Sequence, residues 1–175
     1  SRKQGKFYTV RIGMIKKIFK YLMLFVIVNV ILLMPFWLEA GESNPTSITS
    51  FTLPTLAEGD FIFNPSSGQQ VTVINFWASW CKPCRKEVPE LNAMQEKYAG
   101  QNILFLGINA GEKTNLVQKF VKYTGFEFKI LLDSENKVSD VNKIFSLPRT
   151  LVISKSGQVL YNDSEPPKDL GFSLK

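Results

Sequence analysis

Histidine is absent from this chain, and cysteine occurs only twice in its 175 residues. Without an imidazole the chain can build neither a Ser-His-Asp nor a Cys-His catalytic unit, and every metal site that needs histidine is excluded. The two cysteines, Cys81 and Cys84, stand in the stretch FWASWCKPCRKEVPE at residues 76–90. They leave three interpretations to weigh: half of a metal site, a small structural cross-link, or a redox centre.

Acidic residues are missing from positions 1–20, which hold seven lysines and arginines. The rest of the chain is close to neutral, so the net charge of +6 belongs to this N-terminal tail. Because the basic residues are not spread over the body of the protein, a phosphate-binding face has little support there. We therefore do not expect nucleic acid as a partner.

One long apolar run, YLMLFVIVNVILLMPFWL at residues 21–38, follows the basic tail. It is longer than a signal-peptide core of roughly 7–15 residues and slightly shorter than the ~20 residues of a spanning helix. Basic residues before the run and EAGES after it predict that the N-terminus is cytoplasmic and the rest lies outside. We expect residues 1–20 to be a basic cytoplasmic tail and residues 21–38 a transmembrane anchor. The alternative is a cleaved signal sequence, which would leave a secreted protein.

Hydrophobic residues make up 45% of the sequence, enough for a packed core. The small polar residues at 39–50 predict a linker, and residues 51–175 are expected to form one domain. Strands alternate with helices in this domain, which predicts an α/β fold: a central mixed sheet, helices on both faces and a final hairpin. Strands are predicted at 71–78, 103–109, 128–133, 150–154 and 158–161, and helices at about 82–98, 113–123 and 135–145.

The cysteine pair is best explained as a redox centre. A structural zinc site needs four ligands, and a cross-link between Cys81 and Cys84 would constrain little of the unfolded chain. The junction of a strand and a helix places Cys81 at the helix N-terminus, where free N–H groups and the helix dipole stabilise a thiolate. Lys82 and Arg85 add positive charge, and Cys84 lies close enough to attack a mixed disulfide formed by Cys81.

Several motifs together resemble a known family. NFWASWCKPC, RKEVPEL, LGINAGEK (106–113) and LPRTLVISKSGQVL (147–160) are similar to the membrane-anchored, extracytoplasmic thioredoxin-like proteins of bacteria. These are the TlpA and ResA group, with the CcmG/DsbE proteins as relatives. The resemblance covers most of residues 51–161. It implies a thioredoxin-like fold and a thiol–disulfide oxidoreductase that needs no cofactor beyond its redox-active Cys81–Cys84 disulfide.

The resemblance also implies roles for other residues. Glu87 matches the acidic residue beside the active site in these proteins, and Pro148 falls at the position of a cis-proline that faces the cysteines. Asn75 stands where cytoplasmic thioredoxins have a buried aspartate, so a carboxylate that assists proton transfer must come from elsewhere. The substrate groove is expected to be formed by Trp80, Lys82, Pro83, Leu147, Arg149 and Thr150.

The implied partners are protein disulfides, with apocytochrome c as one candidate substrate and a membrane thiol reductase as electron donor. Two alternatives stay open: a disulfide-forming oxidase, and a non-catalytic thioredoxin-like adaptor or Cu(I)-binding module. The chain departs from the family after Tyr161. Pro166 and Pro167 are incompatible with the last helix of that family, so we expect either a truncated sequence or a less covered sheet face.

Overall fold

The computed structural model describes residues 17–29, 47–57 and 59–174. The chain divides into two units, residues 1–43 and residues 44–175. In the first unit residues 17–29 form a helix, and none of the helices described is long and apolar enough to cross a membrane. Residues 30–38 of the expected anchor and residues 39–46 of the expected linker lie outside the described residues.

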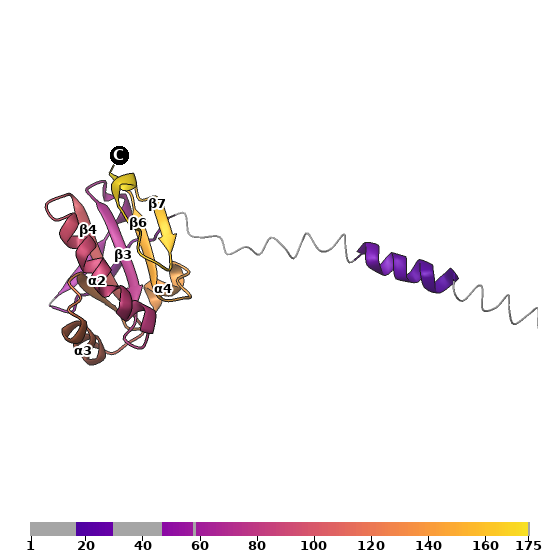
Figure 1. Ribbon diagram of the computed structural model, residues 1–175, viewed down its shortest axis with the longest axis horizontal. Helices are drawn as coiled ribbons and strands as arrows, with labels where there is room; N and C mark the ends of the chain where they lie inside the picture. Colours follow the sequence, from indigo (N-terminus) through magenta and orange to yellow (C-terminus); the bar gives the residue numbers. More distant parts are fainter. Residues whose placement is uncertain (1–16, 30–46, 58, 175) are drawn as a thin grey trace, which may run out of the picture. The chain divides into compact units, whose positions relative to one another are not determined.

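A five-stranded mixed sheet forms the centre of the second unit (Figure 1). Its strands lie in the order β5 (Lys129–Asp133), β4 (Ile103–Ala110), β3 (Val71–Trp77), β6 (Arg149–Ile153), β7 (Val159–Asp163). The pairs β3–β4 and β4–β5 are parallel, whereas β3–β6 and β6–β7 are antiparallel. The predicted mixed sheet and its final hairpin are thus confirmed.

Alternation of side chains along β3 divides the core into two layers, because successive residues of a strand point to opposite faces. Val73 and Trp77 pack on the face that is covered by α2 (Lys82–Lys97) and α3 (Thr114–Thr124). Ile74 and Phe76 pack on the other face. Figure 1 shows α2 running in front of β3.

The opposite face is covered by the β1–β2 hairpin and by α4 (Lys137–Val141). β1 (Phe51–Pro54) and β2 (Asp60–Phe63) pair antiparallel and are followed by the 3-10 turn η1 (Pro65–Ser67). The sequence patterns did not predict this hairpin. Its strands have only four residues each, and the sequence of β2, DFIF, does not alternate apolar and polar residues.

The predicted helix at 135–145 is wrong in extent, since α4 has only five residues. Asn136 and Lys143 both have a φ of 57°, in the left-handed region that interrupts an α-helix. Asp133 accepts hydrogen bonds from the backbone N–H groups of Val138 and Ser139 at 3.2 and 2.8 Å. These hydrogen bonds fix the start of α4.

The residues after β7 form one short 3-10 turn, η2 (Gly171–Ser173). The preceding residue, Leu170, is fully buried in the core layer beneath α2. Its backbone N–H donates to the Tyr98 hydroxyl at 2.8 Å, and that hydroxyl donates to Asp169 at 2.9 Å. This short segment therefore covers part of the sheet face on which α2 also packs.

Candidate active site

Cys81 and Cys84 lie where β3 passes into α2, as the sequence predicted. Their sulfurs form a disulfide with a Cα–Cα distance of 5.3 Å. Cys81 is the N-cap residue of α2, and its Sγ accepts a hydrogen bond from the Cys84 N–H at 3.2 Å. Pro83 stands in the first turn, where a residue without an N–H costs no hydrogen bond. Both cysteines are almost fully buried.

The helix N-terminus is a favourable place for a sulfur that must carry negative charge. The first N–H groups of a helix have no partner within the helix, and the dipole places partial positive charge there. The bond from the Cys84 N–H to Cys81 Sγ is one such contact. The arrangement can therefore stabilise a Cys81 thiolate when the disulfide is reduced.

Glu87 lies one turn beyond Cys84 on the buried side of α2 and is only 9% exposed. Burial raises the pKa of its carboxyl to about 7, and the nearby charges of Glu90 and Glu165 act in the same direction. A hydrogen bond of 2.8 Å from Asn75 Nδ2 to Glu87 Oε1 opposes this rise. A carboxyl with such a pKa can gain and lose a proton near neutral pH.

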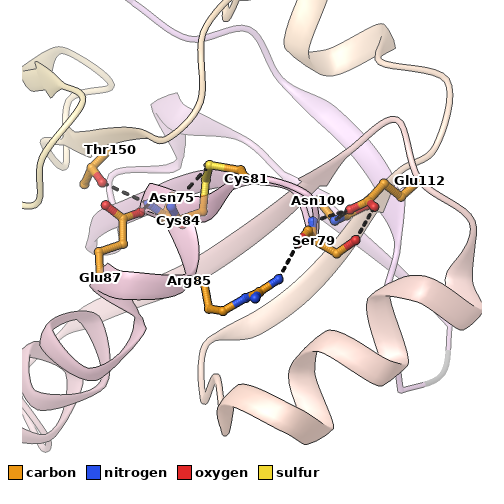
Figure 2. The surroundings of a disulfide bond; sticks show 9 residues. All are labelled: Asn75, Ser79, Cys81, Cys84, Arg85, Glu87, Asn109, Glu112 and Thr150. Atoms are coloured by element: carbon orange, nitrogen blue, oxygen red, sulfur yellow. Dashed lines mark hydrogen bonds between the residues drawn. A yellow bond between two sulfur atoms is a disulfide. The ribbon is translucent and has the colours of Figure 1, made fainter.

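Asn75 connects Glu87 with the neighbouring strand. It is 1% exposed, and its Nδ2 also donates to the hydroxyl of Thr150 at 3.1 Å. Asn75 and Thr150 are direct cross-strand neighbours on β3 and β6. Within the described part of the chain, Asn75 Oδ1 has no hydrogen-bond partner. Figure 2 shows this network, Glu87–Asn75–Thr150, beside the disulfide.

The residues directly before Thr150 lie at the end of the sheet that carries the cysteines. The Leu147–Pro148 peptide bond is cis, as the resemblance implied. β6 begins at Arg149, which pairs with Phe76 of β3. Pro148 therefore lies at the end of the sheet from which β3 leads to the cysteines. Pro148 is buried, while Leu147 and Arg149 are half-buried.

The two tryptophans near the cysteines differ in their surroundings. Trp77 is 1% exposed and stacks on Phe120 with a ring-centroid distance of 4.4 Å. Trp80, directly before Cys81, is 72% exposed, and Lys82 is exposed as well. Trp77 is thus a core residue, and Trp80 is available for contact with another molecule.

A second polar network, which the sequence analysis missed, lies on the other side of the disulfide (Figure 2). Glu112 accepts hydrogen bonds from Ser79, two residues before Cys81, and from Asn109. Glu112 and Asn109 are 7% and 0% exposed. A signal was available, because β3 and β4 were both predicted as strands of one sheet. Parallel neighbours end at the same edge, which brings the residues after β4 close to those after β3.

Comparisons with known proteins agree with this arrangement. The family model of the AhpC/TSA family matches residues 46–162. The thiol-disulfide oxidoreductase ResA of Geobacillus kaustophilus (strain HTA426) is 37% identical over 86 residues, which are 49% of either chain. Sporulation thiol-disulfide oxidoreductase A of Bacillus subtilis (strain 168) is 28% identical over 124 residues, 69% of this chain and 74% of that protein. The chain thus spans about half the length of the ResA proteins that it matches.

A solved structure supports the fold. The putative thiol:disulfide interchange protein DsbE from Chlorobium tepidum superposes with a TM-score of 0.65 at 27% identity, covering 75% of this chain and 93% of that one. The resemblance to the ResA and DsbE proteins is thereby confirmed, and the fold is thioredoxin-like. Since the family model matches well over half of its residues, this chain belongs to the AhpC/TSA family.

Proposed function

We propose that this chain is an extracytoplasmic thiol–disulfide oxidoreductase that reduces disulfides of exported proteins. The observation that carries the proposal is the Cys81–Cys84 disulfide at the start of α2, with Cys81 as the N-cap residue. The names of the relatives, ResA and sporulation thiol-disulfide oxidoreductase A, support the same chemistry. The pair itself supplies both electrons, so no further cofactor is required.

The first step is the attack of the reduced Cys81 on a partner disulfide. The Cys81 thiolate forms a new S–S bond with one partner sulfur and breaks the partner's own S–S bond. The second partner sulfur leaves as a thiolate and takes up a proton from solvent. The helix N–H groups that stabilise the Cys81 thiolate make this step accessible near neutral pH.

Cys84 then resolves the mixed disulfide. Its thiol gives a proton to Glu87, and the resulting thiolate attacks Cys81 Sγ. The partner's remaining sulfur leaves as a thiolate, so that the partner gains two electrons and Cys81–Cys84 becomes a disulfide. Glu87 suits this role because it is three residues from Cys84 on one helix face and has a pKa of about 7. A dithiol reductant, such as a membrane thiol reductase, must then restore the pair.

The substrate groove of the proposal consists of the exposed side chains around the cysteines and the segment at the start of β6. Trp80 and Lys82 are exposed on one side. The segment Leu147–Arg149 leads into β6 at the same end of the sheet. Apocytochrome c is one candidate substrate. Residues 21–38, with basic residues before them, would hold the domain on the outer face of the membrane.

The decisive experiment is a measurement of the reduction potential of the Cys81–Cys84 pair in redox buffers of known composition. A value of about −270 mV, as for thioredoxin, agrees with a reductase. A value of about −120 mV, as for DsbA, would instead indicate a disulfide-forming oxidase. The same samples should be assayed for reduction of a protein disulfide. An inactive dithiol form would overturn the proposal.

A further inference from the structure

The turn that leads from β3 into α2 is held in place by several hydrogen bonds. The Cys81 N–H donates to the carbonyl oxygen of Ala78 at 3.1 Å, which closes a turn over residues 78–81. Ser79 lies inside this turn and uses all its polar groups. Its N–H and hydroxyl donate to Glu112, and its carbonyl oxygen accepts from an Arg85 guanidinium N–H at 3.2 Å.

Glu112 is the residue that binds most of these groups. Its Oε2 accepts from the Ser79 N–H at 2.6 Å and from Asn109 Nδ2 at 2.8 Å, and its Oε1 accepts from the Ser79 hydroxyl at 2.5 Å. All three partners act as donors, which is the environment that an ionised carboxylate requires. Asn109 belongs to β4 and is fully buried, so it anchors Glu112 to the sheet.

We infer that Glu112 is a positioning residue for the reactive cysteine: it fixes the turn at Ser79 so that Cys81 stays at the start of α2. The inference rests on the proposed function, since it concerns the nucleophile of that reaction. None of the contacts involves Glu87 or Thr150, so this network is separate from the one on the other side of the disulfide (Figure 2).

The physical argument concerns the backbone of two consecutive residues. Trp80 is 72% exposed, whereas Cys81 is 3% exposed, so the packing of Trp80 does little to hold the turn. The bonds to Ser79 therefore determine where the turn delivers Cys81. If they are lost, Cys81 Sγ can move away from the Cys84 N–H and from the positive end of the helix dipole, which both stabilise its thiolate.

Substitutions of Glu112 separate its geometry from its charge. Glu112→Gln removes the charge but can keep the geometry. Its carbonyl oxygen replaces Oε2, and its amide donates to the Ser79 hydroxyl, which can also act as acceptor. Glu112→Asp keeps the charge but shortens the side chain by one methylene. Glu112→Ala loses both, and Glu96→Ala, at an exposed position of α2, is the matched control.

The test is the pH midpoint of Cys81 thiolate formation, measured by the rate of reaction with a thiolate-specific alkylating reagent in full-length protein carrying Cys84→Ser. We expect Glu112→Asp to raise the midpoint by about 0.5–1 unit, through loss of helix N–H contacts. Glu112→Ala should raise it by less, because the lost negative charge acts in the opposite direction. We expect Glu112→Gln and the control to show no rise. Loss of a nearby negative charge alone would lower the midpoint, so the sign of the shift distinguishes the two effects.

An unchanged or lower midpoint in Glu112→Asp would overturn the inference, as would a rise in Glu112→Gln equal to that in Glu112→Asp. Should Glu112→Ala fail to fold, the pair Glu112→Asp and Glu112→Gln decides in the same way. Alkylation reads Cys81 directly. A wild-type protein that reduces no disulfide would therefore refute the proposed function without affecting this measurement.

Discussion

At the scale of single residues, Glu87 connects protonation with folding. Its pKa is raised from 4.5 to about 7 by burial, so the folded state binds the proton more tightly than the unfolded state. The stabilising effect of the bound proton is complete below about pH 4.5 and is lost as the pH rises through 7. Glu87→Gln, which stays neutral and can still accept the bond from Asn75, should therefore be more stable than wild type at pH 8. We expect a difference of about 3 kcal/mol.

Urea denaturation of the oxidised proteins at pH 4.5 and at pH 8 measures this difference. The gain in stability should be present at pH 8 and nearly absent at pH 4.5. Glu96→Gln, at an exposed site on the same helix, provides the control and should show no such dependence. Equal stability of Glu87→Gln and wild type at pH 8 would mean that the Glu87 carboxylate is well solvated.

The same carboxyl group should affect resolution of the mixed disulfide. Without a group that accepts the Cys84 proton, Glu87→Gln should release a trapped partner more slowly, by roughly 10²-fold if the proton transfer is rate-limiting. The rate in wild type should rise with pH around 7 and then level off. In the variant Cys84 loses its proton to solvent, so the rate should stay low around pH 7 and rise only at higher pH. Stopped-flow measurement of partner release at several pH values is the direct test. Matching pH profiles would return Glu87 to a structural role.

The two cysteines should behave differently when each is replaced. Cys84→Ser leaves Cys81 able to attack but removes the resolving thiol, so covalent complexes with partner proteins should accumulate. Cys81→Ser should form few, because Cys84 lies one turn inside the helix, away from the N-cap position where the helix N–H groups stabilise a thiolate. Non-reducing gels of the two variants compare them. Equal trapping by both would contradict the assignment of attacking and resolving roles.

What the sequence could predict at this scale depended on local spacing. Cys81, Cys84 and Glu87 lie within seven positions on one helix, so their periodicity alone places them together. The bonds from Asn75 to Thr150 and from Ser79 to Glu112 join residues 75 and 33 positions apart. The predicted strands indicate that Ser79 and Glu112 each follow a strand of one sheet, but the individual pairs depend on strand order and register, which hydrophobic patterns do not specify. The exposures of Trp77 and Trp80 likewise depend on the fold.

At the scale of elements, the short segment after β7 packs on the sheet face that also carries α2. Leu170 is fully buried beneath α2, and filling such a site with a smaller side chain leaves a cavity. Leu170→Ala should therefore lower the free energy of unfolding by about 2–5 kcal/mol. Leu160→Ala, at a position of β7 that is 41% exposed, should cost less than about 1 kcal/mol. Equal costs in urea titrations would show that Leu170 does not contribute to the core.

The elements themselves were predicted with unequal success, for a physical reason. β3 and β4 are apolar along their lengths and are flanked by helical patterns, so periodicity identified them. α4 is bounded by the backbone of Asn136 and Lys143, whose positive φ values no periodicity indicates. The β1–β2 hairpin is held by packing against the sheet face opposite α2. Its four-residue strands are too short to be recognised from the sequence alone.

At the scale of the whole molecule, the expected membrane attachment remains a prediction. The structure describes the apolar segment only as far as residue 29, in a helix over residues 17–29 that is exposed along nearly its whole length. A helix with large apolar residues all around its surface has no polar side that could face water. Basic residues precede the segment, which favours a cytoplasmic N-terminus and an outward domain.

Alkaline extraction of membranes and labelling of intact cells test this topology. If residues 21–38 anchor the chain, the protein should stay in the membrane fraction, and replacing Leu24 and Ile27 by lysine should release it, since each charge costs about 2.5–3.5 kcal/mol within a spanning helix. After reduction, an impermeant thiol reagent should modify the cysteine of the Cys84→Ser variant in intact cells. Soluble wild-type protein would indicate cleavage or no insertion. Labelling only after lysis would place the domain on the cytoplasmic side, where a reductase of exported proteins could not act.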